Sequence, residues 1–216
     1  MAAEKVGLPE TEKFTVAVVE DDPAVSQALD SLLRSVGYDV RTYGAPREIL
    51  ADPHLKLVDC LILDVRMPMS SGFDLQAELA RAEVRVPIIF MTGYGDVPMS
   101  VRAMKAGAVD FLQKPFRDQD MLDAVASAIR GDRDRREASR MLSDHAALFA
   151  SLTQREREVM ALATEGMMNK QIAYELGLSE ITVKIHRGKV MRKMGAKTFA
   201  DLVRLASDLK LGNSRP

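Results

Sequence analysis

The chain has 216 residues, of which 47% are hydrophobic and 28% are charged, and its net charge is −1. This length is enough for one large domain or two small ones, and the composition is typical of soluble globular proteins. No apolar run approaches the roughly 18 residues of a membrane span, and the N-terminus lacks a signal-peptide core. The single Cys60 excludes an internal disulfide. We therefore expect a cytoplasmic protein with no membrane partner.

Charge is divided unevenly along the chain. Residues 151–216 contain 12 Lys and Arg against 7 Asp and Glu, a net charge of +5, whereas residues 1–150 have a net charge of −6. A basic C-terminal part behind an acidic N-terminal part favours a polyanion partner for the basic part. The same charge is also compatible with an ordinary solvated surface, so charge alone does not show that this part binds a polyanion.

Short apolar segments alternate with amphipathic helical segments between residues 14 and 130. Strands are expected at residues 14–19, 39–43, 60–63, 86–91 and 110–113. A helical segment follows each strand: the first begins at Pro23 with Asp22 as its N-cap, and the fourth runs from Asp96 to Ala106. This alternation predicts an α/β flavodoxin-like domain with a doubly wound, five-stranded parallel sheet.

The expected strands deliver charged and hydroxyl side chains to one edge of the sheet. Glu20 and Asp21 follow the first strand, Asp64 ends the third, Thr92 follows the fourth and Lys114 follows the fifth. Carboxyl ends of parallel strands meet at one crevice, where clustered carboxylates repel one another unless a divalent cation such as Mg²⁺ (or Mn²⁺) neutralises them. If Asp64 accepts a phosphoryl group, the Lys ammonium and the Thr hydroxyl opposite it could bind two of the phosphoryl oxygens. Taken alone, an Asp at this position often does no more than begin a loop.

Four segments resemble, in order, the conserved boxes of bacterial response-regulator receiver domains: VVEDD, LILDVRMPMSSG, FMTGYGD and FLQKPF. The resemblance spans about residues 14–130 and implies that a sensor histidine kinase donates a phosphoryl group to Asp64. It also implies that the receiver catalyses only its own phosphorylation and dephosphorylation and is not otherwise an enzyme. The Lys114-Pro115 bond is expected to be cis. The implied roles are metal binding by Asp21, Asp64, the Arg66 backbone carbonyl and (through water) Glu20, catalysis by Lys114 and Thr92, and switching by Thr92 and Phe111.

Residues 131–150 are expected to link two domains. The stretch RGDRDRREASR, at residues 130–140, alternates charge without a core face. A solvated extension of the preceding helix and a flexible tether fit this pattern equally well.

The pattern over residues 151–211 predicts an all-α, four-helix domain. Thr153 and Glu156 form a capping box at its first helix. Asn169 is the expected cap of the second helix and Ser179 the cap of the third. The tight connection between these two helices indicates a helix-turn-helix, a motif that places its second helix in the major groove of DNA.

This part also resembles the LuxR-type four-helix DNA-binding domain over nearly all of residues 151–206. The resemblance brings Asn169 and Lys170 to the DNA backbone, and it makes the final helix a dimer surface, although a core role explains that helix's apolar residues nearly as well. Gly188 stands where related domains often carry a longer polar side chain. The DNA-facing residues expected on the third helix are Thr182, Lys184, Ile185, Arg187, Gly188 and Arg192, and the dimer candidates are Ala200, Leu202, Val203 and Ala206.

Together the two resemblances identify the chain as a member of the FixJ/NarL family of two-component response regulators. They imply a transcription regulator that binds double-stranded promoter DNA as a homodimer once Asp64 is phosphorylated, with RNA polymerase as a further partner. Two alternatives stay open: a phosphorylation-independent DNA-binding regulator whose receiver is only an interaction module, and a phosphatase with an Asp nucleophile. Such a phosphatase commonly needs a second acid two residues after the nucleophile, where this chain has Arg66.

Overall fold

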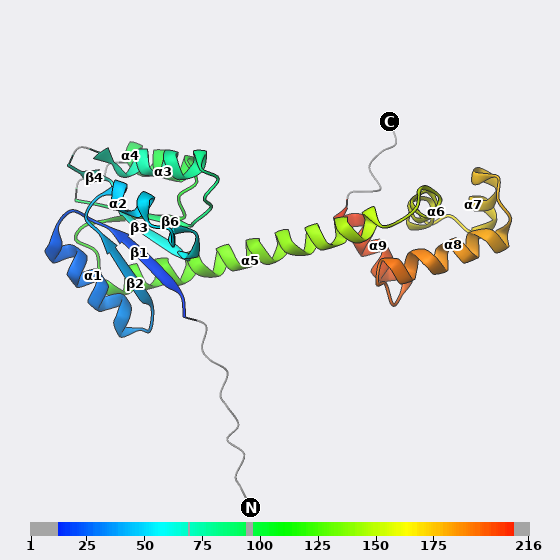
Figure 1. Ribbon diagram of the computed structural model, residues 1–216, viewed down its shortest axis with the longest axis horizontal. Helices are drawn as coiled ribbons and strands as arrows, with labels where there is room; N and C mark the ends of the chain where they lie inside the picture. Colours follow the sequence, from blue (N-terminus) through cyan, green and yellow to red (C-terminus); the bar gives the residue numbers. More distant parts are fainter. Residues whose placement is uncertain (1–12, 69, 94–96, 210–216) are drawn as a thin grey trace, which may run out of the picture. The chain divides into compact units, whose positions relative to one another are not determined.

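The computed structural model describes residues 13–68, 70–93 and 97–209 (Figure 1). The chain divides between Asp134 and Arg135 into two compact units, each with hydrophobic cores of its own. Within the described ranges, no helix is both long enough and apolar enough to cross a membrane.

The first unit is built on a five-stranded parallel sheet with the strand order β2-β1-β3-β6-β7. This order confirms the predicted flavodoxin-like sheet, and the observed strand ends differ from the predicted ones by at most two residues. The strands are β1 (Thr15–Val19), β2 (Asp39–Tyr43), β3 (Cys60–Asp64), β6 (Ile88–Thr92) and β7 (Asp110–Gln113).

Helices cover both faces of this sheet, which confirms the doubly wound architecture. Because successive side chains of a strand point to opposite faces, Val16 and Val18 join one core while Ala17 and Val19 join the other. The first face is covered by α1 and the first part of α5, and the second by α2, α3 and α4. The bounds are α1 (Pro23–Ser35), α2 (Pro46–Ala51), α3 (Gly72–Arg81), α4 (Val97–Lys105) and α5 (Asp118–Ala150), with a short 3₁₀ helix η1 (Leu55–Leu57) after α2. Asp96, the expected start of the fourth helix, lies outside the described residues.

The connection from β3 to α3 is more ordered than the turn expected there. Two short antiparallel strands, β4 (Arg66–Met67) and β5 (Ser70–Ser71), form a hairpin before α3 begins. Ser71 caps α3, since its Oγ accepts a hydrogen bond from the backbone N–H of Phe73 at 3.2 Å. The predicted cap of α1 is confirmed, because Asp22 Oδ1 accepts from the Ala24 N–H at 2.8 Å.

The second unit contains the four predicted helices. Gly177, which ends α7 with a φ of 64°, provides the left-handed residue that the tight connection to α8 requires. The connection between α7 and α8 therefore confirms the predicted helix-turn-helix, whereas residues 210 and 211, the expected end of the domain, lie outside the described part of the chain. The bounds are α6 (Gln154–Thr164), α7 (Asn169–Leu176), α8 (Glu180–Lys193) and α9 (Phe199–Asp208).

The expected cap of α7 is wrong. Asn169 is the first residue of the helix, Met168 occupies the cap position, and Gln171 Oε1 accepts from the Met168 N–H at 2.8 Å. The Asn169 side chain is engaged elsewhere, because its Oδ1 accepts a hydrogen bond from Arg187 at 2.7 Å. The caps predicted for α6 (Thr153) and α8 (Ser179) are confirmed.

The residues of the expected linker are helical. They belong to α5, which continues to Ala150 without a break. Near its end, Phe149 packs against the core of the second unit, while Met141 and Leu142 are exposed. Of the two alternatives that the sequence left open, the structure contains the helical extension.

Glu156 ties two helices of the second unit together. Its carboxylate is buried, accepts from the Thr153 N–H at 2.8 Å and accepts from Lys193 Nζ of α8 at 2.7 Å. The hydrogen bonds from Lys193 and from the Thr153 backbone lower the pKa of Glu156 to about 2. A lowered carboxyl pKa means that the stabilisation is present above the ordinary pKa near 4.5 and is lost as the pH falls towards 2.

We expect Glu156→Ala to lower the free energy of unfolding of the second unit by about 2–3 kcal/mol at neutral pH, because a charged hydrogen-bonded pair is broken and Lys193 loses its partner. The loss should shrink as the pH falls below about 4.5. Urea titrations followed by the amide NMR signals of α6 and α8 measure it. The matched control is Asp201→Ala, which removes the same position of the Thr198 capping box from a less buried site and should lower the free energy of unfolding much less. Equal losses in the two variants would contradict this account.

Candidate functional site

The strand order creates a crevice between β1 and β3. From β1 the chain crosses to β2 on one side and later returns to β3 on the other, so β1 and β3 are neighbours whose connections diverge. Such a point in a parallel sheet leaves room at the carboxyl ends of the two strands. Glu20 and Asp21 directly follow β1, and Asp64 is the last residue of β3.

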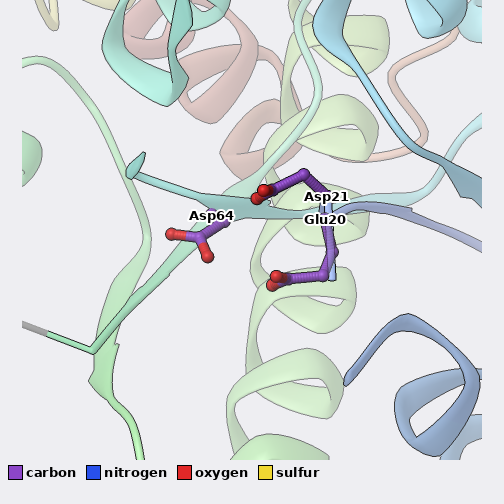
Figure 2. Close-up of side chains that lie close together, drawn as sticks. All are labelled: Glu20, Asp21 and Asp64. Carbon is purple, nitrogen blue, oxygen red and sulfur yellow. The ribbon is translucent and has the colours of Figure 1, made fainter. Parts of the chain in front are cut away.

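The three carboxylates come together in this crevice, as the strand ends predicted. Figure 2 shows Glu20, Asp21 and Asp64 side by side, with one oxygen from each lying within 4.8 Å of the others. Glu20 and Asp64 are 3% and 6% exposed, whereas Asp21 is exposed. Their charges would repel strongly in this partly buried setting without cations nearby.

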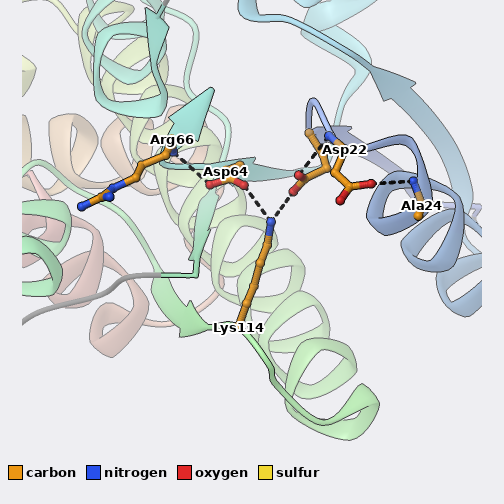
Figure 3. A network of polar contacts seen from close by, with 6 residues as sticks. Asp22, Ala24, Asp64, Arg66 and Lys114 are labelled. Carbon is orange, nitrogen blue, oxygen red and sulfur yellow. Dashed lines mark hydrogen bonds and ion pairs between the residues drawn. The ribbon is translucent and has the colours of Figure 1, made fainter. Parts of the chain in front are cut away.

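Lys114 supplies one of those cations. Its Nζ donates to Glu20 Oε2 at 2.6 Å and to Asp64 Oδ2 at 2.7 Å, bridging the two buried carboxylates (Figure 3). Burial acts to lower the pKa of Lys114, but its hydrogen bonds to Asp64 and Glu20 outweigh burial and raise that pKa above its ordinary value. Burial raises the pKa of Glu20, and the hydrogen bond from Lys114 offsets this only in part. One ammonium against three carboxylates leaves a net negative charge that suits a divalent cation.

Backbone groups fix the orientation of the two buried carboxylates. The Arg66 N–H donates to Asp64 Oδ1 at 2.9 Å, and the Asp22 N–H donates to Glu20 Oε1 at 3.3 Å (Figure 3). Each carboxylate is thus held by a backbone donor on one oxygen and by Lys114 on the other. Asp21 is the member of the cluster that faces solvent.

Thr92 lies on β6, which pairs with β3, and Phe111 lies on β7, which pairs with β6. Thr92 ends β6 and is fully buried, and its carbonyl accepts from the Lys114 N–H at 2.8 Å. Phe111 is half-buried in β7 and packs against the core that contains Phe90. The Lys114-Pro115 bond is cis, as expected. The sheet therefore places the Thr92 and Lys114 backbones next to each other.

Gly72 was not singled out by the sequence, yet it shapes the site. A Cβ on this residue would lie 2.4 Å from the Asp64 carbonyl oxygen and 3.0 Å from the Leu63 and Phe90 side chains. A glycine is therefore required for the start of α3 to pack directly against the end of β3. In the sequence, Gly72 is the last residue of the LILDVRMPMSSG segment and opens the expected helix.

Helix α8 presents an exposed face that contains most of the residues expected to meet DNA. Lys184, Ile185, Gly188 and Arg192 are exposed there, and Lys170 is exposed on α7. Thr182 is half-buried, with its Oγ1 2.8 Å from Ser179 Oγ at the helix cap.

Arg187 does not lie on this exposed face. It is half-buried, its Nη1 donates to Asn169 Oδ1 at 2.7 Å, and its guanidinium lies 4.9 Å from the ring centroid of Phe199. The hydrogen bond and the cation–π contact hold the guanidinium inside the unit, between α7 and α9. Arg187 thus connects α8 to α7 and α9, and its expected contact with DNA stays a prediction.

Two of the four dimer candidates on α9 are buried. Leu202 and Ala206 are 2% and 4% exposed and belong to the core of their own unit, so the core role holds for them. Ala200 and Val203 are exposed. Of the four candidates, Ala200 and Val203 are thus the accessible ones, and the dimer surface on α9 stays a prediction.

Comparisons with known proteins agree with both units. Residues 16–126 match the response regulator receiver domain family, and residues 150–206 match the family described as bacterial regulatory proteins, luxR family. The receiver match alone covers more than half of the chain.

Relatives and solved structures span nearly the whole chain. It is 55% identical over 197 residues to nodulation protein W of Bradyrhizobium diazoefficiens, covering 91% of this chain and 87% of that protein. It is 41% identical to the transcriptional regulatory protein FixJ of the same species, covering 91% of this chain and 96% of FixJ. Among solved structures, the response regulator StyR shares 45% identity at a TM-score of 0.79, covering 90% of this chain and 98% of StyR. Full-length FixJ from B. japonicum has a TM-score of 0.58 at 39% identity, covering 94% of this chain and all of FixJ.

A receiver fold with an acidic crevice and a helix-turn-helix unit thus occur in one chain, in the same order as in relatives that match over most of their length. The chain belongs to the FixJ/NarL family of two-component response regulators, transcriptional regulators that join a receiver domain to a LuxR-type DNA-binding domain.

Proposed function

We propose that this regulator is switched by phosphorylation of Asp64 in the cytoplasm. A sensor histidine kinase donates the phosphoryl group, and the phosphorylated chain forms a homodimer that binds promoter DNA and contacts RNA polymerase. The observation that carries the proposal is the position of Asp64, a carboxylate at the end of β3 that lies 2.7 Å from Lys114 Nζ and belongs to a cluster of three carboxylates. The basic helix α8 in the same chain supports an output on DNA.

The transfer step uses groups already placed in the crevice. A carboxylate oxygen of Asp64 bonds to phosphorus as the P–N bond of a phosphohistidine donor breaks, and the leaving imidazole takes up a proton from solvent. Lys114 passes its hydrogen bond from the Asp64 carboxylate to a phosphoryl oxygen, so that positive charge lies where negative charge develops.

The donor set fits Mg²⁺ or Mn²⁺, which prefer carboxylate, carbonyl and water oxygens. Asp21, Asp64 and the Arg66 carbonyl would hold the ion directly. Glu20 would act through water, as the resemblance to receiver domains implies. When bound, the ion neutralises charge on the phosphoryl oxygens.

The two alternatives are less well supported. A phosphatase needs an acid to protonate the leaving group, and Arg66 stands two residues after Asp64 where that acid is commonly found. A receiver used only as an interaction module would not need Lys114, Thr92 and three carboxylates at one crevice.

Asp64→Asn keeps the shape of the side chain but removes the nucleophile. We expect incorporation of phosphate from acetyl phosphate and Mg²⁺ to fall to background, measured by intact-protein mass spectrometry. Asp120→Asn, at an exposed carboxylate that pairs with Arg117, should be phosphorylated as fast as the wild type. If Asp64→Asn still takes up phosphate at the wild-type rate, the phosphoacceptor has been assigned to the wrong residue.

Mg²⁺ should stabilise the first unit through Asp21. At a hundredfold excess of Mg²⁺ over its Kd the free energy of unfolding should rise by about 2.7 kcal/mol, which scanning calorimetry detects as a higher Tm. Asp21→Asn should be more stable than the wild type in EDTA, because one of three repelling carboxylates is gone, and should gain much less from Mg²⁺. Asp22→Asn is the control, since Asn also caps helices and this variant should respond like the wild type. A full Mg²⁺ response in Asp21→Asn would remove this residue from the ligand set.

Thr92→Ala should leave phosphorylation of Asp64 intact but weaken the dimerisation that follows it. Thr92 is fully buried at the end of β6, between the strands that bear Asp64 and Lys114, so its hydroxyl is suited to follow a phosphoryl group and let Phe111 move inward. We expect this variant to accept phosphate on Asp64 but to dimerise at least tenfold less readily, as measured by light scattering at increasing protein concentration. Unimpaired dimerisation of phosphorylated Thr92→Ala would show that the signal leaves the crevice by another route.

A further inference from the structure

The outermost face of α8 contains two apolar side chains and a glycine, and is not uniformly basic. Val183 and Val190 on one side of the helix are buried in the unit's two cores. Ile181, Ile185 and Gly188 follow at i, i+4 and i+7, which places them together on the opposite side. The two isoleucines are 74% and 53% exposed, and Gly188 is also exposed.

Gly188 has no role within the fold that requires a glycine. A Cβ added there would meet nothing within 4 Å, and Gly188 is not among the residues with positive φ. A glycine inside a 14-residue helix lowers helix stability relative to alanine. A bare backbone at this position is therefore best explained by the close approach of another molecule.

The charges around this face indicate which molecule approaches. Helix α8 carries five basic residues and one acidic residue; Arg192, four residues after Gly188, continues the same side of the helix, and Lys184 lies at its edge. Basic side chains at that place complement the phosphates on the two sides of a DNA groove. Within the major groove, the apolar group that two exposed isoleucines can cover is the C5-methyl of thymine.

We propose that Ile181, Ile185 and Gly188 form a surface that reads thymine methyl groups, with Gly188 allowing the helix backbone to come close to the bases. This inference rests on the proposed DNA-binding function and deepens it, because it assigns base recognition to van der Waals contact. Lys184 and Arg192 anchor the helix on phosphates. Arg187 takes no part, because Asn169 and Phe199 hold it.

The test begins with selection of DNA sites from a random pool by the full-length chain in the presence of Mg²⁺ and beryllofluoride. The selected sites should contain thymines at fixed positions in each half-site. Each of these thymines is then replaced by deoxyuridine, which lacks only the C5-methyl group. At one or more positions the affinity should fall about fourfold, the value of one buried methyl-sized group.

Variants connect this loss to the three residues. Ile181→Ala and Ile185→Ala should bind the thymine and deoxyuridine sites almost equally. Gly188→Ala should raise the Tm yet weaken specific binding, a combination that a merely structural role does not produce. Gly131→Ala is the matched control, since it is also a helical glycine with nothing within 4 Å of an added Cβ, and it should raise the Tm without changing the preference for thymine over deoxyuridine.

Lys184→Ala provides the comparison for phosphate contacts. It should weaken binding to thymine and deoxyuridine sites by the same factor and should reduce the salt slope by about 1.

The outcomes distinguish this inference from the function on which it rests. If no site is selected and no salt-dependent DNA binding occurs, the proposed DNA-binding function fails. If sites are selected but deoxyuridine and the isoleucine variants change nothing, methyl recognition is overturned while DNA binding stands. If the isoleucine variants keep wild-type DNA affinity and instead lose transcription with purified RNA polymerase, the face binds a protein, which also overturns the inference.

Discussion

The hydrogen bonds from Lys114 to Glu20 and Asp64 are the interactions on which the chemistry of this protein depends. They hold a lysine from β7 against carboxylates from β1 and β3, and so join strands that are not all neighbours in the sheet. The ammonium partly neutralises a cluster whose charges would otherwise repel, and it leaves a net negative charge for a cation to complete. Under the proposed function, an incoming phosphoryl group would compete for the same ammonium.

The two units of the chain divide the work of signalling. The first has cores on both faces of a parallel sheet, the second has cores between short helices, and the division falls inside the continuous helix α5. A phosphoryl group on Asp64 changes charge at a single crevice, so its effect on a distinct DNA-binding unit requires an element with two arrangements. Thr92 on β6, which pairs with β3, and Phe111 on β7, which pairs with β6, are the candidates for such an element. Under the proposed function, a dimer that carries two DNA-binding units would gain affinity by effective concentration, without new contacts to bases.

Periodicity and capping residues were sufficient to predict the sheet, its helices and the helix-turn-helix, because strand alternation and helix caps are local signals. The convergence at Asp64 was also predictable, because carboxyl ends of parallel strands share one edge. The inward turn of Arg187 was not, since Asn169 and Phe199, which hold it, come from other helices. Gly72 escaped notice for a similar reason: the backbone that it must accommodate belongs to β3, and only packing brings the two together. Sequence patterns show which face of an element is apolar. They do not show which polar side chains, such as Arg187, are held by contacts with other elements.

The most direct test of the account is the affinity of the full-length chain for a selected DNA site, measured at fixed salt with and without beryllofluoride and Mg²⁺. If phosphorylation of Asp64 controls DNA binding through dimerisation, the phosphoryl mimic should raise affinity on the order of a hundredfold in the wild type and leave Asp64→Asn unchanged. Equal wild-type affinity in the two states would show that the receiver does not control the DNA-binding domain, and would contradict the account.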